Sequence, residues 1–240
     1  MAWFFSDDNF TEKYLIEGED AQHIRKSLRM KEGEELTLIS SDGTEHLCVI
    51  KSLTEGIEVN ELSSKPCEQE PTVKVTLYQG LTKGDKMDFI IQKAVELGVT
   101  EIVPTLTDRC ISRPDEKSMN KKIARWQKIA LGAAQQSRRG IVPQVKPMVT
   151  LKEAAQNAKS DDVSIVFYEG GGKTIAELLK DEPKTVSIFI GSEGGFEESE
   201  IDALVSAGTV NATLGKRILR AETAPLAALS AIMFFTNNME

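Results

Sequence analysis

The sequence has few residues of the kinds that bind metals or form cross-links. Its 240 residues include three cysteines, Cys48, Cys67 and Cys110, and two histidines, His23 and His46. The cysteines are odd in number and no two have CxxC spacing, so neither a disulfide framework nor a metal-ligand cluster is predicted. Unpaired cysteines fit a reducing compartment, and we expect a cytoplasmic protein.

Long hydrophobic stretches are also absent. The longest nearly apolar run, APLAALSAIMFF from Ala224, is shorter than the roughly 20 residues that a helix needs to cross a bilayer. The start MAWFFSDDNF has no basic segment followed by an apolar one, so it does not resemble a signal peptide. We therefore expect neither export nor a membrane partner. The apolar run is interpreted as a helix buried on every side, either in a large core or between subunits.

Positive charge is in short supply, because the formal net charge is -8 at pH 7. This balance argues against indiscriminate binding to nucleic acids, which needs a large positive field, but it allows a local basic surface directed at one RNA. An apolar content of 40% and a charged content of 28% are ordinary for a folded protein. A chain of this length predicts two domains.

The first expected domain, residues 1–68, is small and mostly β. Short β-branched and aromatic runs alternate with turn residues, and SSDGT predicts a hairpin. One helix is expected at DAQHIRKSLRM, and the whole is interpreted as a partly closed barrel. The polar stretch from Ser63 to Thr72 has two prolines and no periodicity, so it is interpreted as a linker.

The second expected domain, residues 73–240, alternates strand-like runs with helical ones. This pattern predicts an α/β domain with a mostly parallel sheet covered by helices on both faces. The pattern TLKE at Thr150–Glu153 is typical of a capping box and predicts a helix start. Ligands of such sheets bind past the carboxyl ends of the strands, so the loops after Phe167, Ile190 and Leu214 are the places to search.

The loop FYEGGGKT ends in GKT, which raises the hypothesis of a phosphate-binding loop in a nucleotide triphosphatase. The full pattern needs a glycine five residues before Gly172, where the chain has Phe167. Glu169 would also place negative charge against the phosphates. A tight, solvated turn is therefore the favoured interpretation.

The loop GSEGG follows the strand that ends at Ile190 and contains no lysine or arginine, so phosphate is an unfavourable ligand. Glycines lack a Cβ and let a flat neutral group such as a purine reach backbone amides and carbonyls. That would suit an adenosine without phosphates. An ordinary strand-to-helix turn, whose acidic residues favour the next helix N-terminus, stays open as the alternative.

The segment LGKRILRAETAP, Leu214–Pro225, combines apolar residues with three cations. Thr223 is placed to cap the next helix, with Pro225 in its first turn. An apolar lining beside fixed cations could hold an adenosine on one side and an electron-rich base on the other. A solvated charge cluster ahead of a core helix is the alternative. The residues concerned are Leu214, Ile218, Leu219, Lys216, Arg217 and Arg220.

Four motifs together carry a resemblance. IIQKAVELGVTEIVP, WQKIALGAAQQSRR, GSEGGFEESEI and LGKRILRAETA, in this order behind a small β domain, resemble the RsmE family of ribosomal RNA uridine-N3 methyltransferases in the SPOUT superfamily. The resemblance covers essentially the whole chain. It implies a PUA-like RNA-binding domain, a methyltransferase domain tied in a deep trefoil knot, and a homodimer with active sites near the interface. Periodicity alone predicts only a plain doubly wound fold.

The resemblance also implies that the chain uses S-adenosylmethionine, yields S-adenosylhomocysteine and needs no metal. Three residues depart from the family pattern: Ser192 stands for proline, Gln135 for glutamate and Cys110 for serine. These departures leave the details of substrate positioning open. The residues expected to hold the methyl donor in a bent conformation are Tyr168, Ile190, Gly191, Glu193, Gly194, Gly195, Leu214, Gly215, Ile218, Leu219, Glu222, Thr223 and Ala224.

Methylation at N3 of uridine removes a proton from that nitrogen. The resulting negative charge spreads onto two carbonyl oxygens, which a fixed guanidinium would stabilise. Arg220 and Arg139 are the candidates for this catalytic role. Glu193 and Glu222 are candidate bases, but each could equally hold backbone amides or an arginine, so the base is left open.

Watson–Crick pairing occupies N3, so the target uridine must be unpaired or flipped. The resemblance implies a uridine in small-subunit (16S) ribosomal RNA, with a preference for the assembled particle. A ribosome-assembly or RNA-binding protein without catalysis is the alternative from another class, and it assigns both loops to structure. The residues expected to bind RNA are Arg25, Lys26, Arg29, Arg109, Arg113, Arg138 and Arg217.

Overall fold

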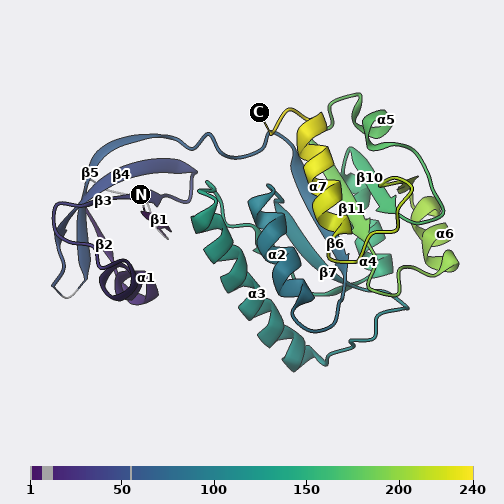
Figure 1. Ribbon diagram of the computed structural model, residues 1–240, viewed down its shortest axis with the longest axis horizontal. Coiled ribbons are helices and arrows are strands. Elements are labelled where there is room, and N and C mark those ends of the chain that lie inside the picture. Colours follow the sequence, from purple (N-terminus) through teal and green to yellow (C-terminus); the bar gives the residue numbers. More distant parts are fainter. Residues whose placement is uncertain (1, 7–12, 55, 240) are drawn as a thin grey trace. The chain divides into compact units, whose positions relative to one another are not determined.

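The computed structural model describes residues 2–6, 13–54 and 56–239 (Figure 1). The chain forms two compact units. The first comprises Met1–Glu70 together with Ala134–Val142, and the second comprises Pro71–Ala133 and Pro143–Glu240. A segment from the middle of the sequence therefore belongs to the N-terminal unit.

A five-stranded sheet forms the first unit. β1 pairs with β3 in parallel, and the other neighbours are antiparallel. β1 and β2 are the edges, with no pairing between them among the described residues. The strand order is β1 (Ala2–Phe5), β3 (Glu35–Ile39), β4 (Thr44–Ser52), β5 (Ile57–Pro66) and β2 (Lys13–Ile16).

The predicted hairpin at SSDGT is confirmed between β3 and β4. Gly43 has a φ of 80°, and the Asp42 carboxylate accepts hydrogen bonds from the Ser40 hydroxyl and the Thr44 amide. The predicted linker is partly wrong, because its first four residues extend β5. These residues pair with β4 as far as Pro66 opposite Thr44.

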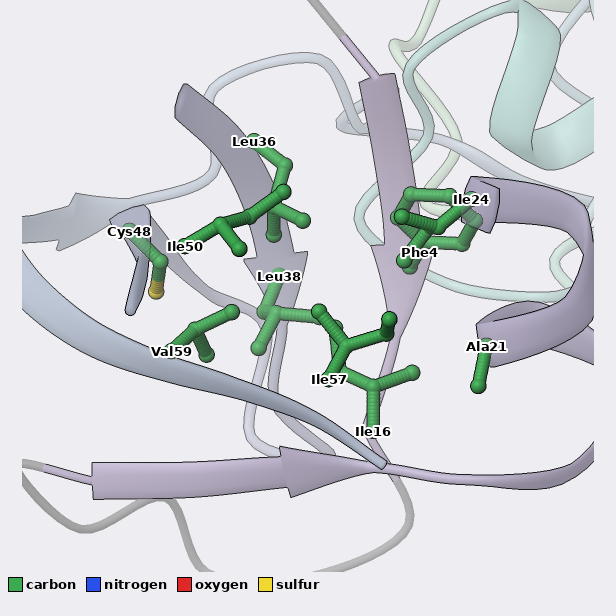
Figure 2. Packing of buried hydrophobic residues seen from close by; sticks show 10 residues of the cluster. All are labelled: Phe4, Ile16, Ala21, Ile24, Leu36, Leu38, Cys48, Ile50, Ile57 and Val59. Carbon is green, nitrogen blue, oxygen red and sulfur yellow. The ribbon is translucent and has the colours of Figure 1, made fainter. Parts of the chain in front are cut away.

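The core of the first unit lies between the sheet and a short helical segment (Figure 2). In β4 every second residue from His46 to Ile50 is buried, as the alternation of strand side chains requires. The helix expected near residue 20 forms as α1 (Gly18–Gln22) and continues as a π-helix, η1 (His23–Leu28). Ile24 and Ala21 from this segment belong to the same core cluster as the strand residues labelled in Figure 2.

The second unit is built on a seven-stranded sheet in which every pair is parallel, which confirms the predicted α/β class. β6 lies between β11 and β7, so strands far apart in the sequence are neighbours. The strand order is β12 (Val210–Ala212), β10 (Val163–Phe167), β11 (Thr185–Ile190), β6 (Lys74–Gly80), β7 (Glu101–Leu106) and β8 (Gln144–Val145), and β9 (Val149–Thr150) also pairs with β7.

Two groups of helices cover this sheet (Figure 1). One group packs around α7 and β11, and the other contacts β7. Tyr78 and Phe189 stack at 4.6 Å between ring centroids inside a core that includes residues of α4 and α6. The helices are α2 (Lys86–Glu96), α5 (Ile175–Leu179) and α7 (Ala224–Phe235) in the first group, α4 (Leu151–Asn157) with η2 (Ala158–Ser160) and α6 (Glu198–Ser206) in the second, and α3 (Glu116–Gln136), which ends in the first unit.

The capping box predicted at Thr150 is confirmed at the start of α4, with reciprocal bonds between Thr150 and Glu153. The expected complete burial of α7 is wrong for the single chain. Phe234 is 64% exposed and Phe235 is 47% exposed, because α7 packs along one side against α2, α5 and β11.

Candidate active site

A cavity of about 710 Å³ lies at the carboxyl ends of β10, β11 and β12. Parallel strands bring the residues that follow them to one edge of the sheet, and this edge is the expected place for a ligand. The volume falls within the range of small-molecule sites. Its walls come from the segments 167–171, 190–196 and 213–224, together with Lys86 and Arg109.

The glycine loop after β11 is packed against its neighbours too closely for side chains. A Cβ on Gly191 would lie 2.9 Å from the backbone of Gly195, and one on Gly80, the last residue of β6, would lie 2.5 Å from the Ser192 nitrogen. The buried Gln79 amide donates to the Gly191 carbonyl at 3.2 Å. The glycines thus serve tight backbone packing, which leaves the inner side of the loop open to the cavity.

Arg109 holds this loop from one side. Its guanidinium makes two hydrogen bonds to Glu197, at 2.8 and 2.9 Å, and a third to the Gly194 carbonyl at 3.0 Å. These contacts with Arg109 lower the pKa of the Glu197 carboxyl. Arg109, expected to bind RNA, is therefore engaged with the protein itself on the cavity wall.

Glu193 anchors the loop on its other side. Its Oε1 accepts a hydrogen bond from the Lys83 amide at 3.0 Å and lies 3.3 Å from the Lys86 ammonium. Burial by itself raises the pKa of Glu193, but the Lys83 amide and Lys86 outweigh it and the pKa is lowered. Lys86 also lies 3.4 Å from Glu222. The two candidate bases are thus paired with one cation.

The segment between β12 and α7 forms the opposite wall. Gly215 has a φ of 99°, and its amide donates to the Thr213 hydroxyl, which fixes the turn. Ile218 is 83% exposed at the rim. The predicted apolar residues and cations of this segment all line the cavity, and no ion pair within the described chain occupies the Arg220 guanidinium.

Thr223 departs from its predicted roles. It does not line the cavity, and its side chain makes no capping hydrogen bond to α7. The reason is local, since Thr223 has helical backbone angles and its amide donates to the Arg220 carbonyl. The predicted proline in the first turn of α7 is confirmed. The other residues expected at the methyl donor all line the cavity.

The GGGKT stretch has a structural role. Thr174 and Glu177 form a capping box at the start of α5, so the amides of these two residues are already bonded. A Cβ on Gly172 would lie 2.3 Å from the Asn211 carbonyl oxygen, and the Lys173 amide donates to that oxygen. The loop therefore packs on β12 as a turn.

Arg139 lies outside the cavity, in the first unit. It is buried, and its guanidinium makes two hydrogen bonds to Glu70. Arg25 donates to the carbonyls of Thr54 and Gly56, and Arg113 donates to the backbone carbonyls of residues 107 and 108. Of the other residues expected to bind RNA, Arg217 lines the cavity rim, and Lys26, Arg29 and Arg138 are exposed.

Comparison with known proteins decides the family. Residues 68–233 match the RNA methyltransferase domain family, and residues 16–59 match the RNA methyltransferase PUA domain. The chain is 37% identical to ribosomal RNA small subunit methyltransferase E of Bacillus subtilis over 233 residues, which cover 93% of the chain and 90% of the relative. The chain belongs to the ribosomal RNA small subunit methyltransferase E family. The expected family and the PUA-like first domain are thereby confirmed.

Solved structures agree with this membership. The small subunit methyltransferase E of Neisseria gonorrhoeae, bound to S-adenosyl methionine, is 32% identical, with a TM-score of 0.90 over 98% of this chain and 97% of that one. A Legionella pneumophila methyltransferase with bound cofactor SAM is 31% identical, with a TM-score of 0.87 over 97% of this chain and 96% of that one.

The positions that depart from the expected pattern of the methyltransferase E family are buried or half-buried. Ser192 lies within the glycine loop on the cavity wall, and its buried hydroxyl has no hydrogen-bond partner within the described residues. Cys110 is buried, with its sulfur 3.2 Å from the Thr107 hydroxyl. Gln135 is half-buried near the end of α3.

Sequence reasoning missed Gln79 and Lys86 in this methyltransferase E chain. Gln79 lies at the end of β6, which is beside β11 in the sheet, and Lys86 is the first residue of the following helix, α2. No glycine run marks the end of β6 in the sequence. A search at the end of every expected strand would have included this segment. Within the described residues no group of histidines, cysteines or carboxylates could hold a metal, and no helix is long and apolar enough to cross a membrane.

Proposed function

We propose that this chain transfers a methyl group from S-adenosylmethionine to N3 of a specific uridine in small-subunit (16S) ribosomal RNA. The observation that carries the proposal is the cavity at the strand ends, walled by glycine backbone and exposed cations. The enzyme from Neisseria gonorrhoeae, with the same fold, binds S-adenosyl methionine.

The residues of the cavity fit such a donor. Its volume of about 710 Å³ suits a nucleoside with an amino-acid tail. Leu214, Leu219 and Ile190 provide apolar surface, and the loop 191–195 presents backbone groups to a purine edge. Glu193 and Glu222 place two carboxylates at the wall, suited to a cationic ligand. The donor supplies a methyl group that is already activated on a sulfonium.

Arg220 is the proposed catalytic residue. N3 of the uracil releases its proton to water and bonds to the methyl carbon, while the bond between that carbon and sulfur breaks and S-adenosylhomocysteine leaves. A guanidinium near the two uracil oxygens stabilises the negative charge that develops on them. Arg220 is exposed and lines the cavity, where its charge could face a bound base. Glu193 is poorly suited to remove the proton, because its pKa is lowered.

The role of Arg139 is proposed to be structural, in contrast to the catalytic role first assigned to it. Its guanidinium is buried and its N–H groups are used by Glu70. Phosphate contacts are assigned instead to the exposed cations Lys26, Arg29, Arg138 and Arg217. Arg25, Arg109 and Arg113 support the backbone around them.

The remaining features of the proposal are a homodimer, a deep trefoil knot in the second unit and a cytoplasmic location near the small ribosomal subunit. Exposed aromatic residues on two adjoining helices, Phe89 on α2 and Phe234 and Phe235 on α7, support association of two copies. Membership in the family supports the knot and the location.

Mass mapping of ribosomal RNA nucleosides from cells with and without this chain tests the proposal. Loss of a single N3-methyluridine in small-subunit RNA, restored by the unaltered chain, is the expected result. An unchanged set of methylated nucleosides would refute it.

The role of Arg220 is tested separately with Arg220→Ala. We expect turnover to fall about 100-fold, as when one charge-stabilising donor is removed, while donor affinity changes little. Lys180→Ala, an exposed substitution after α5, is the control. Unchanged turnover in Arg220→Ala would remove this residue from the reaction.

A further inference from the structure

Lys86 is in an unusual position at the cavity. It is the first residue of α2, yet its ammonium reaches two carboxylates on two other segments. Nζ lies 3.3 Å from Oε1 of Glu193 and 3.4 Å from Oε2 of Glu222. The first belongs to the glycine loop after β11, and the second belongs to the segment before α7. One side chain therefore connects three separate walls of the site.

Few other groups could replace Lys86 as the partner of these two carboxylates. Oε2 of Glu222 is buried and accepts no hydrogen bond of good geometry within the described chain, so Lys86 is the cation that compensates it there. Glu193 has one further donor, the Lys83 amide. Without Lys86 the two carboxylates would face each other at the cavity wall. Repulsion between like charges would push the two segments apart.

The protonation states agree with this geometry. The hydrogen bond to Glu193 raises the pKa of Lys86 above its ordinary value, although partial burial opposes the shift. The pKa of Glu193 is lowered in turn. The ammonium and the carboxylate are therefore both charged at neutral pH, so the connection is present under physiological conditions.

We infer that Lys86 is a positioning residue for the methyl donor, which holds the glycine loop and the segment before α7 at their binding distance through Glu193 and Glu222. The inference rests on the proposed function, since it concerns the same cavity. Lys86 acts through these carboxylates and takes no part in the chemical step. Its removal should weaken binding of donor and product alike, because both carry the adenosine that the two segments enclose.

Calorimetric titration of Lys86→Met with S-adenosylmethionine and with S-adenosylhomocysteine tests the inference. We expect affinity for each to fall about tenfold, the loss of one charge-assisted contact, and Lys86→Arg to recover most of it. In methylation assays the donor KM should rise while kcat at saturating donor stays within about twofold. Lys93→Met is the matched control. Lys93 lies on the same helix, has the same 35% side-chain exposure and also pairs with a carboxylate, that of Glu96.

The outcomes separate this inference from the proposed function. If the unaltered protein binds neither ligand, both fail. If it binds them and Lys86→Met binds them equally well, only the inference fails. If Lys86→Met changes the affinity for S-adenosylmethionine but not for S-adenosylhomocysteine, the effect comes from net charge. That result would also overturn the positioning role of Lys86.

A second variant, Glu222→Gln, covers the case in which Lys86→Met does not fold. It should weaken binding of both ligands by itself. Where Lys86→Met does fold, the effects of the two substitutions should not add in the double variant. Full affinity in a folded Glu222→Gln protein would contradict the proposed link.

Discussion

The guanidinium of Arg139 donates two hydrogen bonds to the carboxylate of Glu70, at 2.8 and 2.7 Å, inside the first unit. The same carboxylate accepts from the Gly140 amide at 2.8 Å, and the Trp3 indole donates to the Arg139 carbonyl at 3.0 Å. These bonds fasten the segment after α3 to residues of the N-terminal unit. A mid-chain segment is thereby part of the first unit's own structure.

Glu70→Ala should lower the free energy of unfolding by about 3 kcal/mol, because it removes the carboxylate that accepts two hydrogen bonds from a buried guanidinium. Urea denaturation measures this change. Glu68→Ala, two residues away and exposed, is the control and should have little effect. A small effect of Glu70→Ala would mean that Arg139 does not depend on this pair.

Gly194→Ala should weaken donor binding at least tenfold. The new Cβ would lie 2.8 Å from the Cβ of Arg109, so the loop must shift or Arg109 must release it. Gly132→Ala is a matched glycine control, since the added methyl on α3 meets nothing within 4 Å, and its higher helix propensity should stabilise the protein by about 1 kcal/mol. Calorimetric titration measures the donor affinity of each variant, and thermal unfolding measures its stability.

The pKa of Glu193 predicts an acid limit for the site. Because the folded state holds this pKa below its ordinary value of 4.5, ionised Glu193 stabilises the fold fully above that value. The contribution is lost as the pH falls through the lowered pKa. Unfolding experiments from pH 7 to pH 3 should therefore show Glu193→Gln less stable than the unaltered protein at pH 7, with the gap closing in acid. A gap independent of pH would contradict the assignment.

Phe234→Asp should separate the subunits of the proposed dimer while leaving the monomer folded. Phe234 is 64% exposed in the single chain, so the new charge costs little there but would be buried in an interface on α7. Sedimentation velocity measures the change in mass. Val205→Asp, which changes an exposed apolar residue on α6, is the control and should leave association unaltered.

Local signals in the sequence were sufficient for much of this structure. The strand that ends at Ile190 and its glycines predicted a ligand loop, and TLKE predicted a capping box that the bonds of Thr150 confirm. Thr174 and Glu177 have the same capping pattern and form a second capping box, although GKT in this stretch is typical of a phosphate loop. Hydrogen bonds between residues three apart can be predicted, since both partners lie in one short stretch.

The contacts that complete the site could not be predicted in this way. Lys86 meets Glu193 because β6 lies beside β11, and the order of strands in a parallel sheet is not written in any one segment. Burial of Arg139 was equally hidden. A cluster of arginines in a sequence suggests side chains that face solvent or bind RNA, unless a distant carboxylate partner is known. The partner of Arg139 is Glu70, which lies in a stretch interpreted as a linker.

The place of β6 in the sheet also affects how the protein is made. β6 pairs with β11 from Lys74 opposite Thr185 to Gln79 opposite Ile190, so a growing polypeptide carries one open strand edge until more than a hundred further residues have been translated. Such edges invite wrong partners and are shielded by chaperones during synthesis. Competence to bind the methyl donor is therefore acquired only when translation of the chain is nearly complete.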